Sequence, residues 1–115
     1  MSFSYEIKEQ EGVIIIYLEG RILDRSEADK MMEEVDVLMD DGKNNFILDL
    51  SKIDYMSSAG LNVMISLLTQ SRNRYGELVV CEVPDKVSRL LVTSKLQNIF
   101  TITDTQAEAL KKVKK

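Results

Sequence analysis

The sequence predicts an α/β domain in which a mixed sheet of about four or five strands has helices packed mainly on one face. Short apolar or β-branched runs alternate with longer segments whose apolar residues recur at helical spacing. This alternation implies parallel strands joined by right-handed crossovers, with helices covering the sheet. The chain has 115 residues, 44% of them hydrophobic, which suffices for one core but not for two. We therefore expect residues 1–115 to form a single domain.

The first part of the chain predicts a hairpin followed by a helix. Residues 4–10 alternate weakly between polar and apolar, a Glu-Gly turn follows, and residues 13–18 are almost continuously apolar. Residues 26–39 then place apolar side chains at helical spacing, and the pattern ends before Gly42, which is typical of a helix stop. Two strands and one helix are expected here.

The rest of the chain predicts three more strands and three more helices. Residues 46–50 are a short apolar run, and residues 58–75 repeat apolar side chains along one helix face. We interpret the polar residues between these two segments as a turn. The later elements are expected to be a strand at 78–83, a helix from Pro84 to about Leu91, a short strand at 100–103, and a final helix capped by Asp104 or Thr105.

The residue types present argue against catalysis. Histidine is absent, which removes the commonest general base and the commonest transition-metal ligand. No serine lies in a Gly-x-Ser-x-Gly elbow. Asp24, Asp49 and Asp54 lack any metal-ligand spacing, so we interpret them as solvated loop acids. We therefore expect no enzymatic activity, no cofactor and no metal.

Charge and hydropathy limit the kinds of partner that the protein can bind and the cellular compartment in which it is expected. The 15 Lys and Arg are scattered among 19 Asp and Glu, with a net charge of −4, so a nucleic-acid partner is not expected. The basic cluster Lys111, Lys112, Lys114 and Lys115 suits the end of a last helix. No apolar run reaches the roughly 20 residues of a membrane span, and no signal peptide is recognisable. We expect a cytoplasmic protein without membrane contact, and Cys81, which lies in an apolar run, to be a buried thiol.

The most informative segment places two adjacent serines, Ser57 and Ser58, at the predicted start of the second helix. A serine there can cap the helix, which contributes about 1 kcal/mol. The exposed N–H groups and the helix dipole can equally accommodate a phosphate, which would add about 1.5 to 2 negative charges to the surface. The residues alone leave capping and phosphorylation both open.

The motif around these serines resembles a known family. Asp49-Leu50-Ser51 followed by Tyr55-Met56-Ser57-Ser58-Ala59-Gly60-Leu61 is similar to the signature of STAS domains, specifically of bacterial anti-sigma factor antagonists. The resemblance extends to residues 18–22, 76–81 and 87–91, and thus over nearly the whole chain. It implies a single STAS domain over residues 1–115.

The resemblance also implies a phosphorylation switch. In that family an anti-sigma factor that is a serine kinase phosphorylates one serine, and a metal-dependent serine phosphatase restores it. By position this serine is Ser58. Many members have Asp before it and Ser or Thr after it, whereas this chain has Ser57 and Ala59, so Ser57 is an alternative acceptor. The unphosphorylated protein would bind the anti-sigma factor and thereby release a sigma factor.

The same resemblance implies a partner-binding surface around the switch. The alternative to a phosphorylation-switched antagonist is a STAS docking or regulatory subunit of a transporter or another complex, which would use such a surface without a phosphoswitch. We expect a monomer or a weak dimer. Leu23 stands where the family often has Asp, with Asp24 one residue later. The residues implied for partner binding are Arg21, Ile22, Asp24, Ser26, Met56, Ser57, Ser58, Ala59, Gly60 and Asn62.

Overall fold

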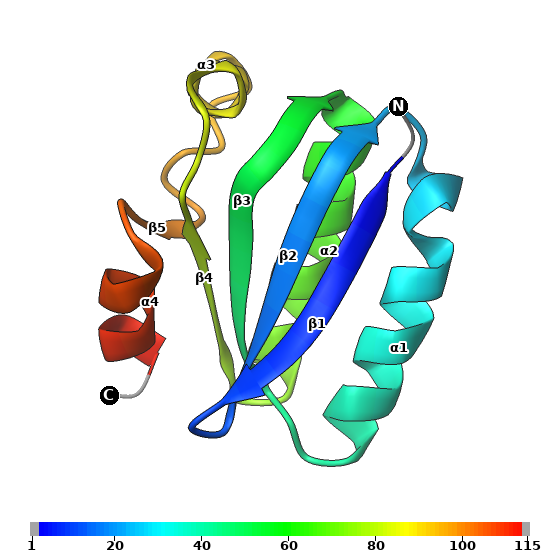
Figure 1. Ribbon diagram of the computed structural model, residues 1–115, viewed down its shortest axis with the longest axis vertical. Helices are drawn as coiled ribbons and strands as arrows, with labels where there is room; N and C mark the ends of the chain where they lie inside the picture. Colours follow the sequence, from blue (N-terminus) through cyan, green and yellow to red (C-terminus); the bar gives the residue numbers. More distant parts are fainter. Residues whose placement is uncertain (1–2, 114–115) are drawn as a thin grey trace.

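A five-stranded sheet with strand order β1-β2-β3-β4-β5 organises residues 3–113, which are the residues that the computed structural model describes (Figure 1). β1 runs antiparallel to β2, and the other neighbouring strands are parallel, so the predicted mixed sheet is confirmed. The elements are β1 (Ser4–Gln10), β2 (Val13–Ile22), the 3-10 turn η1 (Arg25–Ala28), α1 (Asp29–Asp40), β3 (Asn45–Met56), α2 (Ser58–Asn73), β4 (Glu77–Cys81), α3 (Asp85–Thr93), β5 (Thr101–Thr103) and α4 (Gln106–Val113).

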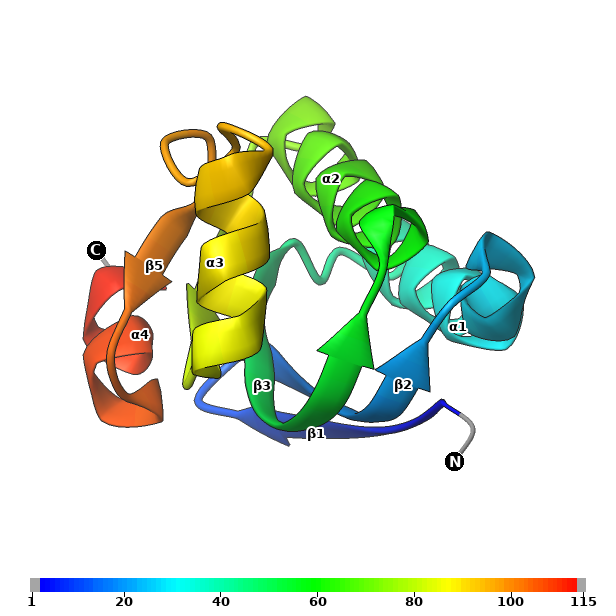
Figure 2. The same ribbon diagram turned by 90° about the horizontal axis from the view of Figure 1, so that it is seen from above.

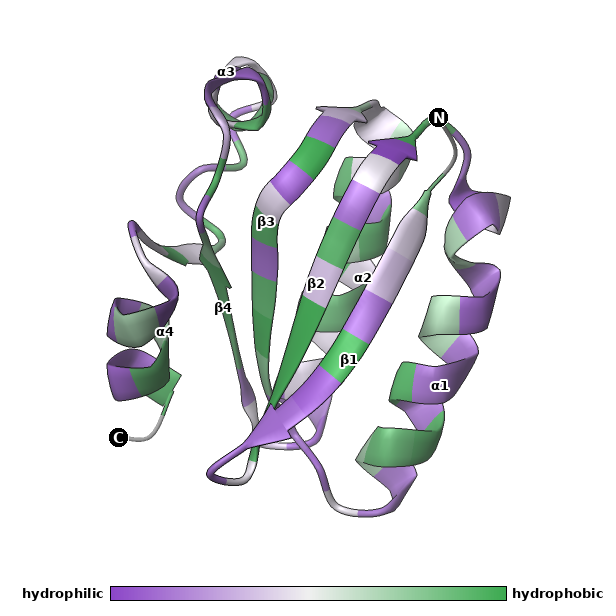
Figure 3. Cartoon of the chain, viewed as in Figure 1, coloured by the Kyte–Doolittle hydropathy of each residue, from purple (hydrophilic) through white to green (hydrophobic). Residues whose placement is uncertain are grey.

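The two faces of the sheet carry cores of different size. Successive side chains of a strand point to opposite faces, so Ile14 and Ile16 of β2 join the larger core, while Val13 and Ile15 join the smaller one. The larger core includes buried side chains of α1, α2 and α3, and the smaller core is covered by α4. Figure 2 shows the first three helices together on one side of the sheet, and Figure 3 shows the hydrophobic residues concentrated in its central strands. The prediction that the helices lie mainly on one face is confirmed.

β3 is longer than the sequence predicts. The residues interpreted as a turn continue the strand to Met56, and Tyr55 and Met56 pair with Arg21 and Ile22 of β2 after two register shifts. Ile53 and Met56 are buried there, whereas the polar residues between them are exposed. Buried and exposed residues therefore do not alternate strictly along this part of β3, where the register shifts occur. A search for strict polar/apolar alternation in the sequence consequently misses the strand.

The interpretation of Asp49 as a solvated loop acid is wrong. Asp49 lies inside β3 and is only 4% exposed. Its carboxylate accepts hydrogen bonds from the backbone N–H of Ser51 and from the side-chain amide of Gln106, each at 2.9 Å. Asp24 and Asp54 are exposed, as expected, although Asp54 lies within β3 and not in a loop. A buried carboxylate is tolerated when its oxygens are hydrogen-bonded, and these two donors fulfil that condition.

The structure also defines the starts of the first and last helices. The helix predicted from Ser26 begins with η1, and α1 itself starts at Asp29. Of the two capping candidates for the last helix, Thr105 is used: its hydroxyl accepts from the Glu108 N–H at 3.2 Å and donates to the Glu108 carboxylate at 3.1 Å. Lys111 and Lys112 lie in the last turn of α4, as predicted, and Lys114 and Lys115 lie outside the described residues.

Candidate functional site

The predicted site lies where β2 and β3 end and α2 begins. The two parallel strands end side by side, since Ile22 pairs with Met56. The backbone N–H of Ser57 then donates to the Ile22 carbonyl at 3.0 Å, and α2 starts at the next residue. In open parallel sheets the carboxyl ends of strands are the usual place for functional groups. The two serines therefore occupy a surface whose backbone is held by both strands.

Ser57 is the N-cap of α2. Its backbone is extended, and its hydroxyl oxygen accepts a hydrogen bond from the Ala59 N–H at 3.1 Å. The same hydroxyl donates to the Leu23 carbonyl at 3.3 Å, so it also links α2 to the segment that follows β2. Its backbone carbonyl accepts from the Gly60 N–H at 3.0 Å. The capping interpretation thus applies to Ser57.

Ser58 is the first residue of α2 and is exposed. Within residues 3–113 its hydroxyl has no hydrogen-bond partner, in contrast to that of Ser57. The first turn of α2 contains no acidic side chain. Because the free N–H groups give the start of a helix a partial positive charge, a phosphate here meets a favourable field and no carboxylate in its own turn.

Gly60 allows α2 to start very close to β3. A Cβ atom at this position would lie 2.2 Å from Cγ and 3.0 Å from Sδ of Met56, and 3.4 Å from Cβ of Ile22. Only glycine fits without displacing these buried side chains. The glycine therefore lets the first turn of α2 pack directly on the buried side chains at the ends of the two strands.

The neighbouring segment after β2 is held by a network of its own. One carboxylate oxygen of Glu27 accepts from the backbone N–H groups of Leu23 and Asp24, at 2.8 and 2.9 Å. The Asp24 carboxylate accepts from the Ser26 N–H at 3.3 Å, which completes a capping box. The Arg25 guanidinium donates to the Ser66 hydroxyl on α2 at 3.3 Å. This segment is thus attached to the serine-bearing helix at two points.

The ten residues implied for partner binding gather at this end of the sheet but differ in exposure. Ile22, Met56 and Gly60 are buried, so they shape the surface from beneath and their side chains are not available to a partner. The other seven are exposed or half-buried. These are Arg21, Asp24, Ser26, Ser57, Ser58, Ala59 and Asn62.

The structure adds apolar groups to this end that the sequence did not identify. Leu23 is 53% exposed and Tyr55 is 42% exposed. The Arg21 guanidinium lies over the Tyr55 ring, 5.7 Å from its centroid. Tyr55 also contributes to a groove of about 280 Å³ between β3 and α3. The sequence alone does not indicate this groove, because residues 51–57 are interpreted there as a turn, whereas Tyr55 lies in β3. The groove is lined by Tyr55, Met56, Lys86, Arg89, Leu90 and Thr93.

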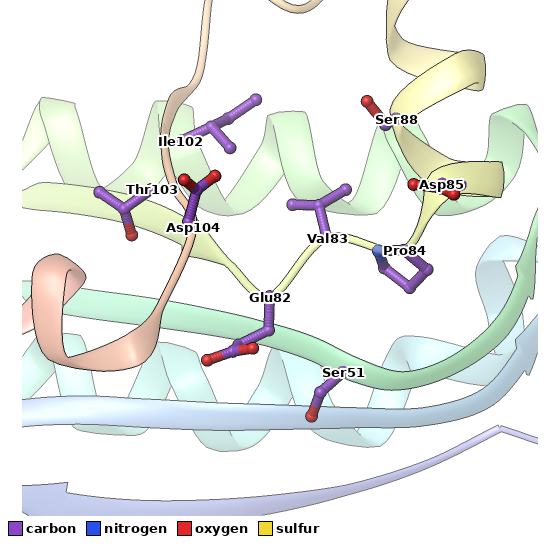
Figure 4. A pocket seen from close by; sticks show the side chains of 9 residues that line it. All are labelled: Ser51, Glu82, Val83, Pro84, Asp85, Ser88, Ile102, Thr103 and Asp104. Atoms are coloured by element: carbon purple, nitrogen blue, oxygen red, sulfur yellow. The ribbon is translucent and has the colours of Figure 1, made fainter.

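A larger pocket of about 540 Å³ lies at the carboxyl end of β4 and contains none of the ten residues (Figure 4). It contains three carboxylates, those of Glu82, Asp85 and Asp104, and one of them, that of Glu82, accepts from the Gln106 N–H at 3.1 Å. A pocket of this charge disfavours an anion.

Residues 3–113 contain neither a metal-ligand cluster nor a membrane-spanning helix. No three acidic or cysteine side chains there are placed to share a metal ion. No helix in this part of the chain has the length and the apolar character that crossing a bilayer requires.

Comparisons with known proteins agree on one family. The model of the STAS domain matches residues 4–109. BtrV of Bordetella bronchiseptica, named as a candidate anti-sigma factor antagonist, is 32% identical over 86% of this chain and 84% of its own. The anti-sigma-B factor antagonist of Listeria monocytogenes is 33% identical over 94% of this chain and 95% of its own.

Solved structures show the same fold. The crystal structure of a candidate anti-sigma factor antagonist from Thermotoga maritima has a TM-score of 0.86 at 26% identity, covering 96% of this chain and 95% of that one. SpoIIAA in its phosphorylated form, a Bacillus protein, has a TM-score of 0.74 at 15% identity, with 96% of this chain and 99% of that one covered.

Proposed function

This chain belongs to the STAS domain family, and from that premise we propose that it is an anti-sigma factor antagonist regulated by phosphorylation of Ser58. In its unphosphorylated form it binds an anti-sigma factor that is a serine kinase, and a sigma factor is released. Phosphorylation by that kinase ends the binding, and a metal-dependent serine phosphatase restores it. The protein acts in the cytoplasm as a ligand and a substrate of enzymes and catalyses nothing itself.

The observation that carries the choice of serine is the difference between two neighbouring hydroxyl groups. Ser57 is half-buried, and its Oγ already accepts from the Ala59 N–H and donates to the Leu23 carbonyl. Ser58 is exposed at the first position of the helix. A kinase must reach the oxygen and deprotonate it, which favours Ser58, and a phosphate on Ser57 would cost the cap and the link to Leu23.

The surroundings of Ser58 support a switch that acts on binding and leaves the fold unchanged. The helix start favours the added charge, so the phosphorylated domain stays folded. The exposed apolar side chains nearby, Leu23 and Tyr55, suit a partner that packs closely. Such a partner would have to desolvate a phosphate of about 1.5 to 2 negative charges, which weakens the complex.

The first test is the intact mass of the protein purified from its own host, with and without phosphatase treatment, followed by peptide mapping across the two serines. We expect a phosphatase-sensitive gain of one phosphate on Ser58. Ser58→Ala should remove the phosphate. Ser57→Asp is the matched control, because Asp is also a good N-cap but cannot be phosphorylated by a serine kinase, and it should keep the phosphate on Ser58.

The second test measures binding to the anti-sigma factor kinase of the same organism by calorimetry. Ser58→Ala should bind like the unphosphorylated wild type, and Ser58→Asp should bind about tenfold more weakly or worse. A phosphate found on Ser57 would contradict the choice of serine. Equal affinity of the wild type and Ser58→Asp would contradict the switch and favour the alternative, a docking or regulatory subunit of another complex.

A further inference from the structure

The outer edge of the sheet is formed by β1, which pairs with β2 on one side only. Its side chains alternate between the two faces. Tyr5 and Ile7 lie opposite Leu18 and Ile16 and pack against the larger core, so they lie on the α1 side. Glu6 and Lys8 lie on the other face, and both are more than half exposed. An unpaired edge strand can pair with another strand unless charges or bulges prevent it.

An apolar groove lies beside the middle of this strand. It has a volume of about 350 Å³ and is lined by Ile7, Glu34, Val37 and Leu38. Val37 of α1 is 61% exposed and lies beside Ile7 and Leu38 in this groove. Figure 3 shows one hydrophobic band in the middle of β1 between hydrophilic bands, with α1 beside it. The groove and the strand edge together form one surface, which we call the β1 edge.

We propose that the β1 edge binds a second copy of this chain, with β1 pairing antiparallel to β1 of the partner subunit about a two-fold axis at Ile7. The two sheets would then form one continuous sheet of ten strands, twice the five of one chain. Association through identical surfaces is the commonest way in which soluble proteins form dimers.

The charges on β1 select this register. In an antiparallel pair, directly opposite residues point to the same face, so a two-fold axis normal to the sheet passes through a residue pair. With the axis at Ile7, Glu6 lies opposite Lys8 of the partner subunit, and Lys8 lies opposite Glu6 of the partner subunit. Opposite pairs of unlike charges stabilise a sheet, and like charges placed opposite each other destabilise it.

The neighbouring registers lack this complementarity. An axis at Glu6 would place the two Glu6 side chains opposite each other, and an axis at Lys8 would do the same with the two lysines. Like charges directly opposite each other destabilise a pair of strands. An axis at Tyr5 would place Glu6 opposite Ser4 and leave Lys8 beyond the end of the partner's strand. One register is therefore favoured, and sliding along the edge is disfavoured.

The apolar groove lies on the same axis. With this register Ile7 meets the Ile7 of the partner subunit on the α1 side, where Val37 and Leu38 complete the groove. Burial of these apolar side chains would favour the association. A strand of seven residues with one small groove covers less area than a standard interface, so we expect a weak dimer.

The dimer surface is separate from the proposed switch. Ile7 pairs with Ile16 in the middle of β2, whereas Ser57 is bonded to Ile22 at the end of that strand. A variant that no longer dimerises would therefore still allow phosphorylation of Ser58 to be measured, and a variant without the phosphate would still allow dimerisation to be measured.

The test is sedimentation velocity of the full chain from about 10 µM to about 1 mM, the range in which a weak dimer dissociates. The wild type should shift toward a dimer with concentration. Glu6→Lys and Lys8→Glu each replace both unlike pairs with like pairs, so each should raise the dissociation constant about tenfold or more. The double variant E6K/K8E restores unlike pairs in reversed order and should associate like the wild type. An equimolar mixture of the two single variants should also associate, because the two ammonium groups of the Glu6→Lys chain would then face the two carboxylates of the Lys8→Glu chain.

Asp104→Lys is the matched control, because it changes the net charge as Glu6→Lys does, at an exposed position away from β1. It should associate like the wild type. A wild type that stays monomeric throughout the concentration range would overturn the proposal. Single variants that associate as strongly as the wild type, or a double variant as weak as the singles, would overturn it as well.

Discussion

At the start of α2, two serines that differ by one position along the backbone have different environments. Ser57 Oγ has a donor and an acceptor within 3.3 Å, whereas Ser58 is exposed to solvent. Two residues later, Gly60 leaves room for the buried Met56 side chain, which a Cβ atom at that position would displace. The different environments of the two hydroxyl groups follow from their positions, Ser57 as the N-cap and Ser58 as the first residue of α2.

We predict that Gly60→Ala destabilises the fold by about 1 to 3 kcal/mol, because the added methyl group would lie 2.2 Å from Cγ of Met56. Urea denaturation followed by circular dichroism would measure the free energy of unfolding. Asn62→Ala on the exposed side of the same helix should change it by less than about 0.5 kcal/mol. In a Met56→Ala background the cost of Gly60→Ala should shrink, and an unchanged cost there would show that the Met56 contact is not its cause.

At the scale of elements, a buried polar contact attaches α4 to the second face of the sheet. The Gln106 side-chain amide donates to the Asp49 carboxylate at 2.9 Å and to the Tyr17 hydroxyl at 3.1 Å. It thereby links the first residue of α4 to β3 and β2, beside the apolar contacts of Ala109 and Val113. The last helix is thus oriented by hydrogen bonds as well as by apolar burial.

We predict that Gln106→Ala lowers the free energy of unfolding by about 1 to 3 kcal/mol, because one oxygen of the buried Asp49 carboxylate would lose its recorded donor. Hydrogen exchange of the α4 amides should accelerate together with this loss. Lys111→Ala on the exposed side of α4 is the control and should leave both measurements nearly unchanged. If the two variants behave alike, the contact does not hold the helix.

At the scale of the whole molecule, the sheet separates two apolar layers, and the thinner layer encloses Cys81. Burial raises the pKa of this thiol from its ordinary value of 9.0 to about 12, and the nearby carboxylates of Asp49 and Glu82 act in the same direction. The folded protein therefore keeps the thiol protonated at a pH at which the unfolded chain would ionise it.

This pKa difference predicts that stability falls in alkali. Above about pH 9 the unfolded state binds fewer protons than the folded state, so the Cys81 contribution, complete below pH 9, is lost as the pH rises toward 12. The slope attributable to one group is at most about 1.4 kcal/mol per pH unit. Urea denaturation between pH 8 and pH 10.5 should show a steeper decline for the wild type than for Cys81→Ala. Parallel curves would contradict this prediction.

Tyr5 adds a second contribution of the same sign, since burial first and then hydrogen bonding to Glu34 and the charges of Glu34 and Glu33 raise its pKa to about 12. Its contribution is complete below its ordinary value of 10.0 and is lost above that pH. The comparison of the wild type with Cys81→Ala cancels this contribution, because both proteins contain Tyr5.

The order of the strands and helices, and the placement of the helices mainly on one face of a mixed sheet, follow from the sequence by itself. Continuous apolar runs such as residues 13–18 and helical spacing such as that of α2 are local patterns, and each residue's neighbours in sequence are enough to reveal them. The motif around Ser58 is also contiguous, so the sequence alone is enough to identify the family resemblance, and the match of the STAS model to residues 4–109 confirms it.

Only the tertiary structure decides what depends on residues distant in the sequence. The burial of Asp49 inside β3 is tolerated because Gln106, 57 positions later, supplies a donor to its carboxylate. The last residues of β3 form a strand because β2 pairs with them across a shifted register. The hydroxyl of Ser57 is engaged because Leu23 offers a carbonyl to it. In each case the stabilising contact joins residues that are far apart in the sequence, so a long segment of chain must close into a loop before the contact can form. A pattern of neighbouring residues does not show such a contact.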